Sequence, residues 1–284
     1  MSAPRIAFLL GRSYPASSMS VFPRVMRALT DAGVVVDVIA GKGRLIDLQT
    51  VRREHDLYVL KQISGVSLSM AGALHAEGAA IVNSYPVTMA LRDKVVAARI
   101  LAGAGVPVPT TYVVSHTELL KPLLDQGPIV VKLYDGTGGY GVCVVRTEGE
   151  LAAVPVDKRH FLAQRYHPPQ GRDLKIYVIG DRLFGVKKKF PARTEEEKHG
   201  EPFTPTPEQC NIALRCGRAF GIDLYGVDFI ESEGQLYVVD MASIPGFKGV
   251  PDAPAHLARY FHAAAERAAQ GDSPASLSLA EARL

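Results

Sequence analysis

The chain has 284 residues and a formal charge of +3, the difference between 32 basic and 29 acidic side chains. Hydrophobic residues make up 47% of it and charged residues 21%. This balance excludes intrinsically disordered proteins, and glycine and proline without a period exclude collagen and coiled coils. The length allows one large domain or two to three small lobes. Because basic residues are scattered except at Lys187–Lys189, we expect no nucleic-acid partner.

The cysteines and the N-terminus indicate the compartment. Cys143, Cys210 and Cys216 cannot all pair within one chain, and none has the histidine spacing of a zinc site. We therefore expect free thiols in a reducing compartment. The apolar run Ile6–Leu10 is too short for a signal peptide or a membrane span. The sequence thus predicts a soluble cytoplasmic protein without a membrane partner, and a homodimer is the commonest assembly for such proteins.

The first part of the chain, to about residue 85, alternates strand and helix patterns. Strands are predicted over residues 6–10, 34–39, 56–60 and 80–83, and helices over residues 21–32 and 70–77. Strands that alternate with helices are typical of a parallel sheet. Residues 1–85 therefore read as a small α/β lobe.

Beyond a predicted helix over residues 92–104, the pattern becomes one of hairpins. Strands are predicted over residues 128–132, 142–145, 161–166, 174–179, 182–186, 225–230 and 235–240, and helices over residues 208–220 and 257–269. Turn residues such as Gly180-Asp181 join neighbouring strands. The polar, proline-rich segment 191–207 is predicted as a mobile loop, and the tail after Gln270 as frayed.

A glycine-rich segment, Asp135–Gly141, separates two of these strands. Such glycines let backbone N–H groups converge on an anion without obstruction by Cβ atoms. The segment is not a Walker A loop, since no Gly-Lys-Ser/Thr follows, and no helix follows to make it a dinucleotide fingerprint. A phosphate-binding loop and a flexible hairpin turn remain the two interpretations.

Two lysines favour the phosphate. Lys132 ends the strand that leads into the glycine loop, where its ammonium group can reach a phosphate. Lys94 opens a predicted helix, where a cation opposes the helix dipole and needs an anionic partner or full solvation.

Two aspartates indicate a metal ion. Asp228 and Asp240 lie on the two strands of the last predicted hairpin, so antiparallel pairing brings their carboxylates close together. Carboxylates among apolar strand residues are costly unless they share a cation, and hard oxygen ligands near a phosphate loop suit Mg²⁺. The alternative is a pair of exposed aspartates at strand ends.

In their order along the chain these features resemble the ATP-grasp enzymes. The resemblance covers roughly residues 83 to 262 and rests on Lys94, Lys132, Gly136–Gly141, Gln164–Tyr166, Asp173 with Lys175, Asp228, and Asp240 followed by Pro245-Gly246. The segments 83–94 and 105–110 are similar to the RimK-like branch, the ribosomal-protein-modifying glutamate ligases. The segments 175–181 and 239–248 are equally similar to the inositol-trisphosphate kinase branch.

The resemblance implies an α/β and α+β fold. An N-terminal α/β (pre-ATP-grasp) lobe over residues 1–85 precedes an ATP-grasp domain over residues 86–270, whose two lobes clamp ATP. The central lobe spans about residues 110–165 and the C-terminal lobe about residues 166–265, with residues 271–284 as a tail.

The resemblance also implies roles for individual residues, with ATP and Mg²⁺ as cofactors. For the nucleotide, Lys94 and Lys132 hold the ATP phosphates, and the glycine loop closes over them with Gly136, Thr137, Gly138, Gly139, Tyr140 and Gly141. Adenine is bound by Gln164, Arg165 and Tyr166, and the ribose by Asp173. Mg²⁺ is bound by Asp228 and Asp240, while Lys175 with Lys187 or Lys189 faces the transferred phosphoryl group or the acceptor.

The leading function is ATP-dependent ligation of a carboxylate to an amine through an acyl phosphate. The alternatives are a kinase of an inositol phosphate or similar polyol, and a degenerate ATP-binding protein without catalysis. The last arises because Ala242 stands where the family has a metal-binding asparagine, and the adjacent Ser243 is expected to point to the opposite face of its strand.

We expect a small-molecule or peptide acceptor to bind in a pocket between the N-terminal lobe, the 191–207 loop and the Pro245–Gly249 turn. Loop residues Arg12, Ser13, Tyr14 and Ser17 are expected to line it, because ligands bind beyond the carboxyl ends of parallel strands.

Overall fold

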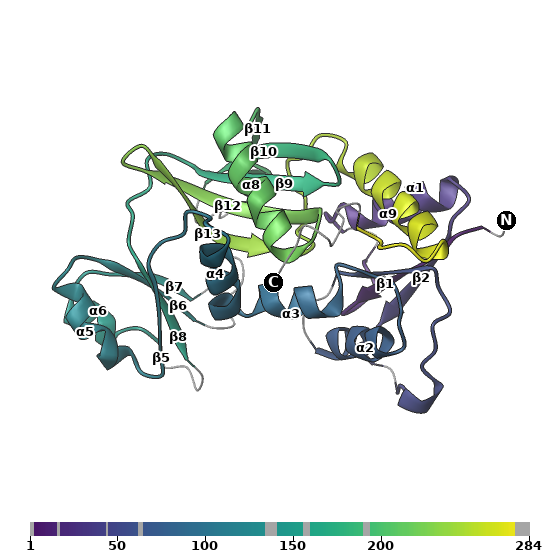
Figure 1. Ribbon diagram of the computed structural model, residues 1–284, viewed down its shortest axis with the longest axis horizontal. Coiled ribbons are helices and arrows are strands. Elements are labelled where there is room, and N and C mark those ends of the chain that lie inside the picture. The colour runs from purple at the N-terminus through teal and green to yellow at the C-terminus, as the bar shows by residue number, and fades with distance from the viewer. Residues whose placement is uncertain are drawn as a thin grey trace.

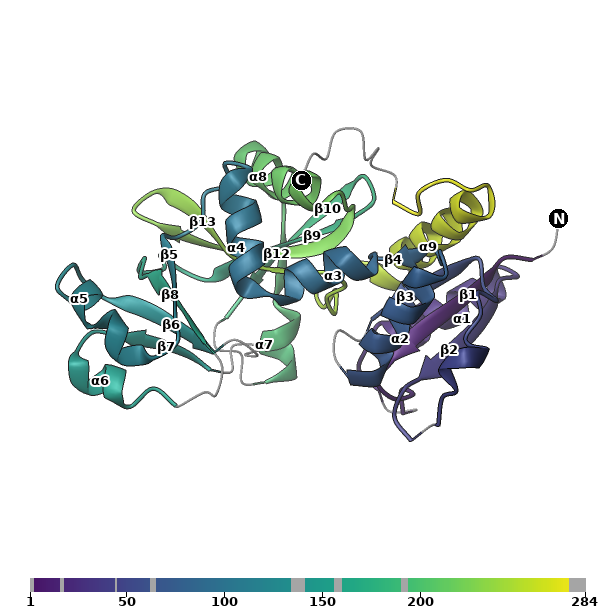
Figure 2. The same cartoon turned by 60° about the horizontal axis from the view of Figure 1, so that its bottom comes forward.

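The computed structural model describes residues 3–15, 18–43, 45–61, 65–133, 141–155, 160–189 and 194–275. Within these residues the chain forms three sheets (Figure 1). Both views of the molecule show one sheet at each end and the third between them (Figure 2). No helix in these ranges combines the length and the hydropathy needed to cross a bilayer.

The N-terminal lobe is the expected parallel sheet, with strands in the order β2-β1-β3-β4. Its elements are β1 (Arg5–Leu10), α1 (Phe22–Asp31), β2 (Val35–Ala40), a 3₁₀ turn (Leu48–Thr50), β3 (Leu57–Leu60), α2 (Gly65–Ala76) and β4 (Ile81–Val82). Side chains of β1 alternate between two cores, since Ile6 and Phe8 pack towards α1 whereas Ala7 and Leu9 pack towards α2. Burial on both faces explains why the strand is an unbroken apolar run.

The last helix, α9 (Ala253–Ala269), returns to this lobe. It packs beside α1 (Figure 1), and the ring centroids of Phe8 and Phe261 are 5.7 Å apart. One face of the N-terminal sheet is therefore covered by a helix from the far end of the chain.

The helix expected over residues 92–104 is in fact the second of two. Arg92 ends α3 (Tyr85–Arg92), and α4 (Lys94–Gly103) begins after a break at Asp93. The Asp93 carboxylate accepts hydrogen bonds from the backbone N–H groups of Val95 and Val96 at 3.0 and 3.1 Å. Asp93 is thus an N-cap that places Lys94 at the first helical position.

The central lobe is an antiparallel sheet in the order β5-β8-β6-β7. Its strands are β5 (Thr111–Val114), β6 (Ile129–Leu133), β7 (Val142–Val145) and β8 (Phe161–Arg165), covered by a 3₁₀ turn (Thr117–Leu120), α5 (Lys121–Leu124) and α6 (Glu148–Ala152). Strand β5 was not expected from the sequence, because its four residues follow a proline-rich stretch. Residues 134–140 and 156–159 lie outside the described residues.

The C-terminal lobe is an antiparallel sheet in the order β11-β10-β9-β12-β13. Its elements are β9 (Asp173–Ile179), β10 (Arg182–Lys188), α7 (Glu195–His199), β11 (Glu201–Phe203), α8 (Pro207–Phe220), β12 (Leu224–Ser232) and β13 (Gln235–Ala242). Helix α8 packs on one face, where Ile176, Val178 and Val227 share a core with Ile212 and Cys216. The opposite face is left for the charged residues of β9, β12 and β13.

The segment 191–207 is more ordered than the predicted mobile loop in its described part, residues 194–207. Thr194 caps α7 through a reciprocal capping box with Glu197, and β11 then pairs with β10 from Gly185 to Lys187. The polar composition misled the prediction, because this helix is stabilised by its cap and not by an apolar face.

Candidate active site

Strand register brings three of the predicted residues to one face of the C-terminal sheet. Lys175 of β9 lies directly opposite Asp228 of β12, and Asp228 lies opposite Asp240 of β13. Residues directly opposite each other in an antiparallel pair share a face. Lys175, Asp228 and Asp240 therefore form a row across three strands, which we call the charged row.

Asp228 is engaged by Lys175. The Lys175 Nζ atom lies 2.8 Å from Oδ1 and 2.9 Å from Oδ2 of Asp228. Their side chains are 16% and 32% exposed, respectively. Burial alone would lower the pKa of Lys175, but the Asp228 carboxylate outweighs it and raises that pKa above its ordinary value.

Asp240 is the more open carboxylate, with 49% of its side chain exposed. Its Oδ1 atom lies 3.4 Å from the Nζ atom of Lys94. Lys132 approaches from the central lobe and donates a 2.9 Å hydrogen bond to the backbone carbonyl of Val239. Burial lowers the pKa of Lys132 to about 8, although the charge of Asp240 opposes this effect.

A small cavity joins the central lobe to this edge of the sheet. Four residues predicted to bind nucleotide or metal are among those that line it: Lys94, Lys132, Gln164 and Asp240. Its volume is about 30 Å³, the size of one water molecule. Ligand pockets for molecules of nucleotide size hold several hundred Å³, so the space between these described residues is smaller than a nucleotide needs.

The residues predicted to contact adenine lie at the end of β8. Gln164 is buried, and its Nε2 atom donates a 3.1 Å hydrogen bond to Thr111 Oγ1. The backbone N–H groups of Arg165 and Tyr166 donate to the carbonyls of Thr110 and Pro128, respectively. These two N–H groups are therefore committed to backbone hydrogen bonds, which leaves carbonyl groups at this strand end to meet a ligand.

The glycine loop is only partly described. Gly136, Thr137, Gly138, Gly139 and Tyr140 lie outside the described residues. Gly141 has a φ of 74°, and its carbonyl accepts a 3.0 Å hydrogen bond from the N–H group of Leu133. The role of the loop in phosphate binding stays a prediction.

Asp173, predicted to bind ribose, shares the face of the charged row. Burial and the nearby charge of Asp228 raise its pKa to about 6. It lies directly opposite Lys188 in the β9–β10 pair. A group that titrates close to neutrality beside a nucleotide site gives a measurable pH dependence.

We expect Asp173→Asn to raise the melting temperature at about pH 8 and not at about pH 4. Because the folded-state pKa exceeds the unfolded value, the stability that this carboxyl contributes is present at low pH and is lost as pH rises through about 6. After allowance for partial exposure, the amide should recover about 1 kcal/mol, or about 2–4 °C. Scanning fluorimetry at both pH values measures this, with Asp181→Asn in the β9–β10 turn as control. An equal shift at both pH values would contradict the assignment.

The three consecutive lysines have different surroundings. The ammonium group of Lys187 lies over the Phe203 ring, 5.6 Å from its centroid, and that of Lys189 pairs with Glu197 at 2.9 Å. Both were predicted to face the reacting groups, and the structure does not bring either to the charged row. The reason is strand alternation, which a sequence cannot fix to the residue.

Lys188 is the lysine on the face of the charged row. It donates a 2.9 Å hydrogen bond to the Tyr177 hydroxyl, and Lys175 lies over the same ring, 5.7 Å from its centroid. Burial and the neighbouring charge of Lys175 lower the pKa of Lys188 to about 8. From the sequence, its neighbours Lys187 and Lys189 were predicted as catalytic candidates, whereas Lys188 was not singled out.

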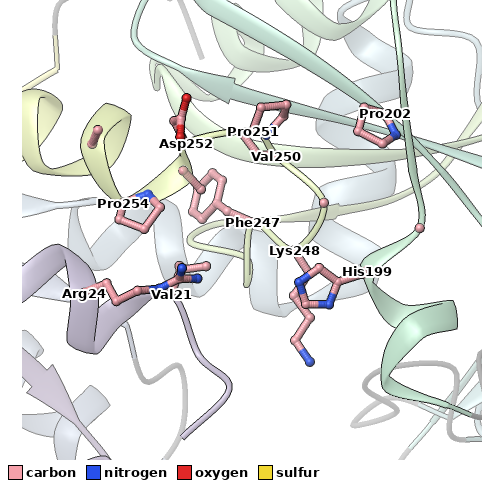
Figure 3. A pocket seen from close by; sticks show the side chains of 14 residues that line it. Val21, Arg24, His199, Pro202, Phe247, Lys248, Val250, Pro251, Asp252 and Pro254 are labelled. Atoms are coloured by element: carbon pink, nitrogen blue, oxygen red, sulfur yellow. The ribbon is translucent and has the colours of Figure 1, made fainter.

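A second, larger cavity of about 500 Å³ adjoins this cluster (Figure 3). It lies where the acceptor pocket was expected, between the N-terminal lobe, the α7–β11 turn and the segment from Phe247 into α9. The ring centroid of Phe247 is 5.4 Å from that of Tyr177. These two buried rings lie between the cavity and the face that carries Lys175 and Lys188.

The cavity combines apolar walls with cations. Phe247 and Val250 line it together with Pro202, Pro251 and Pro254, while Arg24, His199 and Lys248 enter from three different segments (Figure 3). Asp252 is the one acidic side chain among its lining residues. Such a lining suits a substrate that carries negative charge.

Two tight turns hold the cavity in shape. Gly249 has a φ of 85°, and a Cβ atom on it would clash with the backbone carbonyl of His199. Phe247 and Asp252 adopt positive φ values of 49° and 48° without being glycine. Strained backbone of this kind is concentrated at functional sites.

The N-terminal loop residues expected at this pocket do not line it. Arg12, Ser13 and Tyr14 are absent from its lining, and the Tyr14 ring instead stacks on Phe22 at 6.5 Å between centroids. Ser17 lies outside the described residues. Arg24 in the first turn of α1 contributes the charge in their place.

Ala242 adds no metal ligand, and neither does its neighbour. Ala242 lies opposite Gly226, on the face of the charged row. Ser243 is buried and its hydroxyl accepts a 3.0 Å hydrogen bond from Asn83 Nδ2, so it serves the contact with the N-terminal lobe. In the part of the chain that the structure describes, no three His, Cys, Asp or Glu side chains gather into a metal site. Asp240 is a hard oxygen ligand that suits Mg²⁺, with Asp228 beside it but paired to Lys175.

Comparison with known proteins now decides the family. Residues 91–258 match the model of the RimK-like ATP-grasp domain. The chain belongs to the RimK-like ATP-grasp family. The resemblance drawn from the sequence and its ligase branch are thereby confirmed.

Similar proteins include named ligases. A probable alpha-L-glutamate ligase of Alkalilimnicola ehrlichii is 30% identical over 209 residues, 66% of this chain and 69% of that protein. The ribosomal protein bS6–L-glutamate ligase of Shigella boydii is 27% identical over 205 residues, 66% and 68% of the two chains. The crystal structure of a RimK domain ATP-grasp protein from Sphaerobacter thermophilus superposes with a TM-score of 0.71 at 18% identity, covering 90% of this chain and 98% of that one. The RimK-like fold expected from the sequence is confirmed.

Proposed function

We propose that this RimK-like protein is a cytoplasmic ligase that uses ATP to join a carboxylate of a peptide or small acid to the amine of an amino acid. The observation that carries the proposal is the cationic 500 Å³ cavity, whose Phe247 packs on Tyr177, the ring that contacts Lys175 and Lys188. A nucleotide on the charged row and an acceptor that extends from the cavity would meet at Lys175 and Lys188. Membership of a family whose named relatives are glutamate ligases supports the same reaction.

The nucleotide would lie between the central and C-terminal lobes. Lys94 and Lys132 would neutralise its phosphates, the carbonyl groups at the end of β8 would accept from the adenine amine, and Asp173 would bind the ribose hydroxyls. Mg²⁺, when bound at Asp240, would neutralise part of the charge on the transferred phosphoryl group. The protein contributes mainly position and charge to such a reaction.

The reaction we propose has two steps. The substrate carboxylate attacks the γ-phosphorus of ATP, which forms an acyl phosphate and releases ADP. The acceptor amine then attacks the acyl carbon, so that a C–N bond forms, the C–O bond to phosphate breaks and inorganic phosphate leaves with a proton passed to solvent. Lys175 and Lys188 would stabilise the negative charge that develops in both steps.

The cavity favours an acidic amino acid as the amine substrate. Two cations, Arg24 and Lys248, face one carboxylate, Asp252, among the lining residues. An amino acid with a second carboxylate would be held by more than one of these cations. We propose L-glutamate, in agreement with the names of the relatives.

The test measures ADP release with L-glutamate and a short peptide that ends in glutamate, each alone and both together, and mass spectrometry of the peptide. Release that needs both, with one glutamyl residue added to the peptide, is the expected result. Release with a single polyol phosphate as acceptor would favour the kinase instead. Binding of Mg–ATP without turnover, with turnover restored by Ala242→Asn, would identify a degenerate nucleotide-binding protein.

A pair of arginines on α1 supplies a matched control for the cavity. Arg24 lines it, whereas Arg27 is exposed and does not. Arg24→Ala should raise the KM for L-glutamate about tenfold, the loss of one charge-assisted hydrogen bond, and leave the affinity for ADP unchanged. Arg27→Ala should change neither. Equal KM values for L-glutamate in both variants would show that the cavity does not bind this substrate.

A further inference from the structure

The two carboxylates of the charged row are not equivalent as metal ligands. Both oxygens of Asp228 lie within 2.9 Å of one ammonium group, that of Lys175. Asp240 meets Lys94 through one oxygen at 3.4 Å and is 49% exposed. A cation already contacts both carboxylate oxygens of Asp228, whereas Lys94 contacts one oxygen of Asp240.

Lys175 is held in place by its surroundings. Its Nζ atom lies over the buried Tyr177 ring, 5.7 Å from the centroid. Its stem runs across Gly226, where a Cβ atom would come within 3.2 Å of the Lys175 Cε atom. The Lys175 side chain is only 16% exposed. If a metal ion displaced its ammonium group from Asp228, the charge of Lys175 would stay buried without a partner, which costs free energy.

On one side of the charged row, the neighbouring positions add no oxygen. Gly226 and Ala242 lie opposite each other beyond the two aspartates, and neither side chain can coordinate a metal ion. On the other side lies Asp173, whose pKa is raised to about 6 by burial and by the charge of Asp228, so it offsets little of the repulsion that a divalent ion on Asp228 would meet from Lys175.

We propose that this chain holds a single Mg²⁺ on Asp240, and that the ammonium group of Lys175, fixed on Asp228, supplies the positive charge that a second metal ion would otherwise bring to the ATP phosphates. The proposal rests on nucleotide binding, which the family implies, and is independent of the acceptor. With Lys175 in this role, the protein does not need a metal ligand at position 242, where it has alanine.

Counting bound Mn²⁺ in the complex with a non-hydrolysable ATP analogue tests the proposal. Electron paramagnetic resonance titration should give one Mn²⁺ per wild-type chain. Lys175→Met should gain a second, weaker Mn²⁺, because Asp228 loses its cation. Lys94→Met, which removes the partner of Asp240 instead, should still bind one. Two Mn²⁺ in the wild type, or one in Lys175→Met, would overturn the proposal.

A second pair of variants keeps the proposal testable if Lys175→Met fails to fold, which a thermal melt reveals. Asp240→Asn should weaken Mn²⁺ binding at least about 30-fold, the loss of its one charged protein ligand. Asp228→Asn should weaken it less than about threefold, because Asp228 is not a ligand. Equal losses would show that both aspartates bind metal and would overturn the proposal. Titration of the analogue without acceptor separates these outcomes from a failure of the ligase assignment.

Discussion

Lys132→Met is expected to weaken the binding of Mg–ADP by about 100-fold, which corresponds to about 3 kcal/mol. The ammonium group of Lys132 is buried at the contact between the central lobe and β13, where it donates to the carbonyl of Val239. A phosphate bound there would meet a cation shielded from water, so the interaction is strong. Calorimetric titration with ADP measures the loss.

The same lysine should make nucleotide affinity depend on pH. Its pKa is lowered to about 8 by burial, so the free protein loses this charge above that pH, and binding must then take up a proton. The affinity of the wild type for ADP should fall as pH rises above about 8, whereas Lys132→Met should show no such fall.

Lys121→Met is the control for both measurements. Lys121 belongs to the same lobe but is exposed and paired with Glu148 at 2.9 Å. Its removal should leave the ADP affinity and its pH profile unchanged. A loss as large as that of Lys132→Met would mean that general charge, and not the buried ammonium group, governs binding.

Lys188→Met is expected to lower kcat by at least about 100-fold, the usual effect of removing one donor to a developing charge. Lys188 is half-buried and donates a hydrogen bond to Tyr177, and it lies close enough to Lys175 of the charged row and to Lys248 of the larger cavity for both charges to add to burial in lowering its pKa. The steady-state rate with ATP, L-glutamate and the glutamate-terminated peptide measures the effect. Affinity for ADP should change less than about threefold, because ADP lacks the transferred group.

The neighbouring lysines provide the comparison within one strand. Lys187→Met and Lys189→Met remove the same charge but alter contacts with Phe203 and Glu197. Each should retain at least about half of the wild-type kcat, since neither faces the reacting groups. If Lys187→Met or Lys189→Met lost more activity than Lys188→Met, the catalytic lysine would be the one predicted from the sequence and not Lys188.

The order of elements was readable from the sequence wherever a pattern was long. The parallel N-terminal lobe follows from unbroken apolar strands such as Ile6–Leu10, and the C-terminal hairpins from glycine turns such as Gly180. Short elements stabilised by caps or by pairing were not predicted, as β5 and α7 show. Their stability comes from partners distant in sequence, which local patterns do not report.

Individual site residues could be predicted only where a strand carries a single candidate of the required type. Asp228 and Asp240 could be paired in advance, because a hairpin with one aspartate on each strand leaves few registers. Among three consecutive lysines the choice depends on a single-residue register of β10 against β9, and a shift by one residue turns every side chain to the other face. The pairing of Asp228 with Lys175 depends on the register of β12 against β9, two strands far apart in the sequence, and was not foreseen.

The return of α9 to the N-terminal sheet has a consequence for how the chain is made. The core beneath β1 and β3 includes Leu257, Phe261 and Ala265 of α9, which leave the ribosome long after these two strands. Until then Ile6 and Phe8 lack part of their cover, so the N-terminal lobe waits for α9 before its packing is complete. Residues 1–85, although they read as a unit, therefore lack part of their core when separated from α9.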